Sequence, residues 1–151
     1  MARVVVISGA NRGTGRGIAE AFHACGDRVV GLNRTPSGLP WLTEVPCDLR
    51  DWAAIEAAVS RVVEHFGRID ILVNNSGVST TQRIQDVTPE DYDFIFNTNV
   101  KGAFFVAQEV GKRMLARSRG AAPGSFTGGR IINIASMAGL KVLPQIGAYC
   151  M

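Results

Sequence analysis

Cysteine is scarce in this sequence, and its spacing excludes the sites that cysteines usually build. The 151 residues include three cysteines, Cys25, Cys47 and Cys150. They form no C-x-x-C pair and their number is odd, which argues against a disulfide framework and against a zinc site. Reduced thiols, as in the cytosol, are the expected state. We therefore expect no metal site and look for function in other residues.

Long hydrophobic runs are also missing. No apolar stretch approaches the ~18 residues that a membrane-spanning helix needs. The apolar run near the start, residues 4–7, is too short for a signal peptide and lacks a small-residue cleavage site after it. The composition, 46% hydrophobic and 19% charged, is that of a soluble globular protein. These features predict a cytoplasmic protein with no membrane partner.

The charge pattern offers no strip of basic residues. The formal net charge is +3, a mild excess, and the basic residues are scattered. Arg113, Arg117 and Arg119 come closest to a cluster, and we interpret them as a solvated helix end. We therefore expect no nucleic-acid partner.

The sequence does have a regular alternation of strand and helix patterns. Runs rich in β-branched residues are typical of buried parallel strands, and we expect them at residues 3–8, 28–33, 43–47, 69–73 and 130–135. Apolar residues recur between them at helical spacing, and the helix at 100–115 is expected to place Phe104, Ala107, Val110 and Met114 on one side. The alternation predicts an α/β, Rossmann-type, doubly wound parallel sheet, truncated after about five strands. We expect a single dinucleotide-binding domain over residues 1–151 that is incomplete at its C-terminal end.

A glycine-rich turn follows the first predicted strand, Ser8-Gly9-Ala10-Asn11-Arg12-Gly13-Thr14-Gly15. Gly9 allows a tight turn, Gly13 lets the backbone approach a pyrophosphate, and Gly15 allows close packing of helix on strand. The helix that follows supplies free N–H groups and positive potential at its first turn. The position of this turn, between a strand and a helix, predicts a phosphate-binding site.

The spacing Gly-x-x-x-Gly-x-Gly after a serine resembles the short-chain dehydrogenase/reductase family. Asp48 matches the family acid that contacts the adenine ring, and Asn74-Asn75-Ser76-Gly77 resembles the Asn-Asn-Ala-Gly segment near the nicotinamide ribose. The layout is closest to 3-oxoacyl-[acyl-carrier-protein] reductase-like members. The cofactor residues that we predict are Ser8, Gly9, Asn11, Arg12, Gly13, Thr14, Gly15, Asn33, Arg34, Asp48, Leu49, Asn75, Ser76 and Gly77.

The end of the second strand bears on the choice of cofactor. Enzymes that prefer NAD place a carboxylate there, to bind the ribose 2′-hydroxyl. This sequence has Asn33 and Arg34 with no acid nearby, and Arg12 lies in the glycine turn. Two guanidinium groups that converge on one pocket suit a 2′-phosphate, because arginine binds phosphate oxygens in a bidentate manner. We predict NADP, with NAD and solvated surface arginines as the alternatives.

The resemblance also implies a catalytic set of Ser136, Tyr149 and Asn99. In the family a serine and a tyrosine at this spacing converge on the substrate oxygen, and the helix asparagine supports a proton relay. Ser136 would donate a hydrogen bond to the oxygen as negative charge builds on it. Tyr149 would act as general acid or base, assisted in the family by a lysine four residues later. That position lies two residues beyond Met151.

Family members usually run to about 250 residues with seven parallel strands, as the resemblance implies. We therefore expect this chain to be a fragment of a longer enzyme, with a truncated inactive product and a non-catalytic dinucleotide-binding module as alternatives. The fifth strand is expected to be a bare edge, and the full-length form a homodimer or homotetramer. The expected reaction is hydride transfer between NADP(H) and a small-molecule carbonyl or secondary alcohol. The substrate is 3-oxoacyl-like or, alternatively, a sugar alcohol or dihydrodiol.

Overall fold

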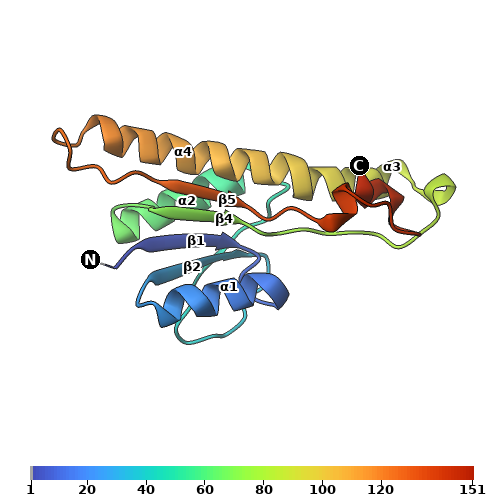
Figure 1. The fold of residues 1–151 in the computed structure, drawn as a ribbon, viewed down its shortest axis with the longest axis horizontal. Coiled ribbons are helices and arrows are strands. Elements are labelled where there is room, and N and C mark those ends of the chain that lie inside the picture. Colours follow the sequence, from blue (N-terminus) through green and yellow to red (C-terminus); the bar gives the residue numbers. More distant parts are fainter. Residues whose placement is uncertain (1) are drawn as a thin grey trace.

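The computed structural model of the protein describes residues 2–151 and contains a five-stranded parallel sheet with helices on both faces (Figure 1). The strands are β1 (Val4–Ser8), β2 (Arg28–Asn33), β3 (Thr43–Pro46), β4 (Ile71–Asn74) and β5 (Arg130–Asn133). The helices are α1 (Gly13–Ala24), α2 (Trp52–Phe66), α3 (Pro89–Phe96) and α4 (Ala103–Arg119). The strand order is β3-β2-β1-β4-β5, which confirms the predicted Rossmann-type sheet.

The central strand β1 is buried on both of its faces. Val4 and Val6 pack into the core that α2 and α4 cover, whereas Val5 and Ile7 pack into the core beneath α1. Figure 1 shows α2 and α4 on one side of the sheet and α1 on the other. A strand between two layers of helices needs apolar residues in succession, and this explains the unbroken valine and isoleucine run.

The helix ends lie where capping residues predict them. The carboxylate of Asp51 accepts a hydrogen bond from the backbone N–H of Ala53 at the start of α2. Gly67 ends that helix with a left-handed backbone, φ 74°. At the start of α3, the hydroxyl oxygen of Thr88 accepts from the N–H of Asp91. These local signals fix the helix limits without help from distant residues.

The helix predicted over residues 100–115 begins later, as α4 at Ala103, and runs to Arg119. A π-helical turn, η2 (Asn97–Gly102), joins α3 to α4. A Cβ on Gly102 would lie 2.6 Å from the carbonyl oxygen of Leu49, so this close approach fixes which side of α4 faces the sheet. Val106 is fully buried on that side, whereas Phe104 is 60% exposed. Phe104 was predicted to share one side of the helix with Val110 and Met114, which are buried. It lies outside that buried side, because the approach at Gly102 sets the rotation of the helix.

The fifth strand lies at one edge of the sheet, as expected, and it ends at Asn133 rather than residue 135. Ile131, Ile132 and Ile134 are each between 41% and 43% exposed. Within residues 2–151, no helix is long and apolar enough to span a membrane.

Candidate functional site

A cavity of about 680 Å³ opens at the carboxyl ends of β1, β2 and β4. Ligands of open parallel sheets bind at this edge, where the strand order changes direction, here between β1 and β4. The lining residues are Gly9, Asn11, Arg12, Gly13, Thr14, Gly15, Leu32, Asn33, Arg34, Thr35, Cys47, Asp48, Leu49, Asn75, Ser76, Gly77, Val78 and Thr98. The structure therefore brings together every predicted cofactor residue except Ser8.

The glycine turn has the geometry that its sequence predicts. Gly9 and Gly13 have φ values of +70° and +54°, a left-handed conformation that favours glycine. A Cβ on Gly15 would overlap the carbonyl oxygen of Gly9 and the side-chain amide of Asn75. The first turn of α1 can approach β1 and β4 this closely only because position 15 has no side chain.

The first turn of α1 differs from those of the other two helices that start near a loop. Asp51 caps α2 and Thr88 caps α3, whereas the N-cap of α1 is Arg12, whose side chain makes no capping hydrogen bond. The first turn of α1 carries no acidic residue, which it shares with α2 but not with α3. Its N–H groups therefore face the cavity without a side-chain acceptor, as a phosphate-binding helix end requires.

Ser8 lies beneath the cavity and does not line it. It is 1% exposed, and its hydroxyl oxygen accepts hydrogen bonds from the backbone N–H groups of Asn75 (3.0 Å) and Ser76 (3.1 Å). The Asn75 amide in turn donates to the carbonyl oxygens of Ser8 and Gly9. We predicted Ser8 as a cofactor residue; in the structure it joins the ends of β1 and β4, because its side chain points between them.

An acid does lie beside the end of β2, contrary to the prediction. The Glu44 carboxylate, from the neighbouring strand β3, accepts a hydrogen bond from the Asn33 side chain at 2.8 Å. The sequence does not indicate this contact, because Glu44 is eleven residues after Asn33 and comes next to it only when β3 pairs with β2. Glu44 does not line the cavity, whereas Arg12 and Arg34 do, and both are exposed.

Two titratable groups at the end of β3 have shifted pKa values. The hydrogen bond from Arg50 is the main reason why the pKa of Asp48 falls to about 2, so Asp48 is a carboxylate at neutral pH. Burial is the main reason why the pKa of the Cys47 thiol rises to about 11, with help from the charges of Asp48 and Asp51. A protonated, buried thiol is a poor nucleophile, which makes Cys47 part of the cavity wall.

Two short 3₁₀ turns, η3 (Met137–Gly139) and η4 (Gly147–Cys150), pack against each other; Ser136 is the N-cap of η3 and Tyr149 lies in η4. The Ser136 hydroxyl oxygen accepts a hydrogen bond from the N–H of Ala138 at 3.1 Å. Because its oxygen is the acceptor, the hydroxyl hydrogen remains able to donate. Neither residue lines the cavity described above.

Asn99 lies in the π-helical turn η2 and supports one wall of the cavity. Its side-chain oxygen accepts from the N–H of Val78 and its amide donates to the carbonyl oxygen of Val78, both at 2.8 Å. Val78 lines the cavity. The Asn99 side chain is thus committed to holding the segment after β4, and π-helical turns are frequent at functional sites.

Several lining residues were not predicted: Leu32, Thr35, Cys47, Val78 and Thr98. Leu32 lies near the carboxyl end of β2 and Cys47 directly follows β3. Because ligands bind at the carboxyl ends of parallel strands, the predicted strand limits could have identified both residues. Thr98 lies in η2, and no sequence signal marks that turn.

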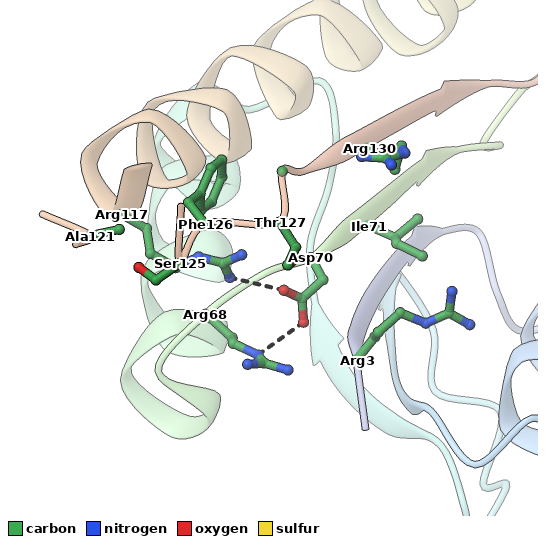
Figure 2. Close-up of a pocket in the computed structure, with 11 residues that line it drawn as sticks. Arg3, Arg68, Asp70, Ile71, Arg117, Ala121, Ser125, Phe126, Thr127 and Arg130 are labelled. Carbon is green, nitrogen blue, oxygen red and sulfur yellow. Dashed lines mark hydrogen bonds and ion pairs between the residues drawn. The ribbon is translucent and has the colours of Figure 1, made fainter. Parts of the chain in front are cut away.

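A second cavity, of about 540 Å³, lies at the opposite edge of the sheet (Figure 2). It is rich in arginine, but Arg68 and Arg117 both point to the Asp70 carboxylate, at 2.9 Å each. Asp70 also accepts from the N–H of Val4 at 2.9 Å, and Arg3 pairs with Asp27. Arg3, Arg68 and Arg117 are thus paired with acids, whereas Arg130, which also lines the cavity, donates to the carbonyl oxygen of Gly129 at 3.2 Å. Because three of its four arginines are paired, we interpret this cavity mainly as a structural ion-pair cluster. Among residues 2–151 there is no group of three or more side chains that could hold a metal ion.

Comparison with known proteins agrees with the geometry. A family model described as short chain dehydrogenase matches residues 3–151. Galactitol 2-dehydrogenase from Agrobacterium fabrum is 38% identical over 156 aligned residues, which cover 98% of this chain and 58% of the relative.

Solved structures show the same likeness. An NAD⁺-bound xylitol dehydrogenase matches with a TM-score of 0.86 at 29% identity. The match covers 98% of this chain and 58% of the xylitol dehydrogenase chain. A 3-ketoacyl-(acyl-carrier-protein) reductase from Brucella melitensis, complexed with NADH, has a TM-score of 0.85 at 29% identity and covers 98% and 62%. The chain thus spans about three fifths of the length of these proteins. A match along nearly the whole of its length indicates common descent, and the chain belongs to the short-chain dehydrogenase family, whose members are NAD(P)-binding oxidoreductases.

Proposed function

We propose that the protein transfers a hydride between NADP(H) and a carbonyl or secondary alcohol. The observation that carries the proposal is the cavity at the carboxyl edge, where an uncapped helix end and a glycine turn leave backbone N–H groups open. Its volume, about 680 Å³, is within the range of small-molecule and cofactor sites. The residues present therefore fit a dinucleotide.

NADP is proposed over NAD because of the charges at the ribose end of the cavity. Arg12 and Arg34 both line it and are exposed, and a guanidinium group is a good partner for a phosphate. Glu44, the nearby acid, is engaged by Asn33, Ser37 and Gly38 and does not reach the cavity lining. The likeness to a protein bound to NAD⁺ does not decide between the cofactors, because the family fold serves both.

The bound cofactor would supply or accept the hydride, and the chain's own residues would handle the substrate oxygen. The oxygen of the Ser136 hydroxyl accepts from the N–H of Ala138. The same hydroxyl would donate a hydrogen bond to the substrate oxygen. Tyr149, on the adjacent turn, would give it a proton during reduction or remove one during oxidation. Asn99 would act as a positioning residue through its two bonds to Val78.

A sugar alcohol, or the corresponding keto-sugar, is the proposed substrate class. The relative at 38% identity is named for galactitol, and one of the two structures for xylitol. A 3-oxoacyl thioester is the second candidate, supported by the likeness to a 3-ketoacyl reductase and by the short connection between β2 and β3.

Absorbance of NADPH at 340 nm tests both. We expect NADPH to form from NADP⁺ with galactitol or xylitol, and little oxidation of NADPH with acetoacetyl thioesters; the reverse pattern would favour the second candidate.

Arg34→Asp tests the cofactor, because it replaces a phosphate-binding cation with a repelling anion. We expect a loss of NADP⁺ affinity of about tenfold or more, about 1.4 kcal/mol. An unchanged NADP⁺/NAD⁺ preference would argue against the proposed NADP site.

A further inference from the structure

The loop after β2 forms the wall of the cavity at the end of β2, where the cofactor ribose is proposed to bind. This loop has no helix or strand of its own. Arg34 and Thr35, which line the cavity, begin this loop, and residues 35–40 have neither helix nor strand. A wall made of a free loop would pay an ordering cost at each binding event. Something in the fold must therefore hold its backbone in place if Arg34 is to meet a ligand in one orientation.

The loop is held at two points. On the side of the glycine turn, the amide of Asn11 donates to the carbonyl oxygen of Thr35 at 3.0 Å. On the side of β3, the carboxylate of Glu44 accepts from the N–H groups of Ser37 (2.8 Å) and Gly38 (3.2 Å). The second contact is charge-assisted, and such bonds are roughly twice as strong as those between neutral groups.

Asn33 connects these two sides. Its side-chain oxygen accepts from the N–H of Ala10, in the glycine turn, at 2.8 Å, and its amide donates to Glu44 at 2.8 Å. Asn33 is only 4% exposed, its bond with Ala10 is buried, and its bond with Glu44 is partly buried. The phosphate-binding turn and the loop are thus joined through one buried amide and one carboxylate.

The Glu44 carboxylate is the acceptor in each of its hydrogen bonds with Asn33, Ser37 and Gly38. Burial would raise its pKa, but the bonds from Ser37, Asn33 and Gly38 outweigh burial and hold the pKa below its usual value. Glu44 is therefore ionised at neutral pH. Because the carboxylate does not line the cavity, its effect on a ligand has to pass through the groups that it holds.

We propose that Glu44 is a positioning residue for cofactor specificity: it fixes the loop at residues 35–38 so that Arg34 meets the 2′-phosphate of NADP. This inference rests on the proposed NADP site. The opposite sign is physically possible, since a nearby anion repels phosphate. The donors that surround Glu44 offset its charge locally, so we expect the loss of loop order to outweigh the relief of repulsion.

The test compares Glu44→Gln with Glu56→Gln, a matched change at an exposed position on α2. Glutamine keeps the size of the side chain, but its NH₂ group would face donors only. We expect the NADP⁺ dissociation constant, measured by calorimetry, to rise about tenfold in Glu44→Gln, while that for NAD⁺ changes less than threefold. Neither constant should change in Glu56→Gln. A merely structural role would weaken both cofactors equally.

A second variant, Ser37→Pro, removes the donating N–H from the loop and leaves the Glu44 charge in place. It should show the same selective loss of NADP⁺, and it keeps the test valid if Glu44→Gln does not fold. Equal losses for both cofactors, no loss, or tighter NADP⁺ binding would overturn the inference. An unaltered chain that binds neither dinucleotide would instead refute the proposed function, so the two failures are distinguishable.

Discussion

The two edges of the sheet use polar groups in opposite ways. At the amino edge, Arg3, Arg68 and Arg117 pair with carboxylates of the same chain, and Arg68 and Arg117 share one acid, Asp70 (Figure 2). At the carboxyl edge, the first turn of α1 is uncapped and Arg12 and Arg34 face a cavity. Polar groups that satisfy one another stabilise a fold, whereas donors left open are available to a ligand. The comparison therefore assigns stability to the amino edge and the proposed binding of a dinucleotide to the carboxyl edge.

The largest expected effect is at Gly15. Gly15→Ala would place a methyl group against the Gly9 carbonyl oxygen and the Asn75 amide, so the glycine turn must shift. We expect NADP⁺ affinity, measured by calorimetry, to fall by at least about 100-fold, or about 2.7 kcal/mol. Gly17→Ala is the matched control, because a Cβ there meets nothing within 4 Å. Similar losses in both variants would contradict the assignment of binding to this turn.

At the other edge, Asp70→Asn should act on stability alone. Asp70 is mostly buried and serves two arginines and the N–H of Val4. We expect the free energy of unfolding in urea to fall by about 2 kcal/mol, a value between those of surface and buried ion pairs. NADP⁺ affinity should change less than threefold; a large loss would show that the amino edge also contributes to binding.

Ser8→Ala tests the support beneath the cavity. The change leaves the N–H groups of Asn75 and Ser76 without their acceptor, which should cost about 1 to 2 kcal/mol of unfolding free energy. NADP⁺ affinity should fall as well, because those residues line the cavity. Calorimetry and urea unfolding on the same preparation separate the two effects, and unchanged values in both would show that Ser8 holds nothing in place.

The smallest effect is the pH dependence contributed by Asp48. Its pKa in the folded state, about 2, lies below the ordinary value of 3.8, mainly because of the hydrogen bond from Arg50. A depressed pKa contributes stability that is present above the ordinary value and is lost as the pH falls through about 2. Urea unfolding of the parent and of Asp48→Asn should therefore differ at pH 6 and converge towards pH 2. A difference at pH 2 as large as that at pH 6 would exclude this origin, because about half of the Asp48 carboxyls of the folded state are protonated at pH 2.

Local signals in the sequence predicted most of the fold. The cap at Asp51, the glycine at position 67 and the Thr88-Pro89 start each fix a helix limit through neighbouring residues alone. The valine run of β1 predicted a strand buried on both faces. The rotation of α4 could not be predicted in this way, because it depends on the contact between Gly102 and Leu49, which are far apart in the sequence.

The same limit applies to the site. The glycine turn carries its own backbone requirements, so its geometry could be predicted from residues 8–15 alone. The acid beside Asn33 was missed because Glu44 comes from the neighbouring strand. That Ser8 lies beneath the cavity could not be predicted either, because the direction of its side chain depends on β4. Contacts between strands decide these roles, and a single sequence does not display them.

The most direct test of the account is a calorimetric titration of the folded chain with NADP⁺ and with NAD⁺. The account predicts saturable binding of both, with NADP⁺ the tighter ligand, and loss of this binding in Gly15→Ala but not in Gly17→Ala. A chain that is folded by circular dichroism and takes up neither dinucleotide would contradict it.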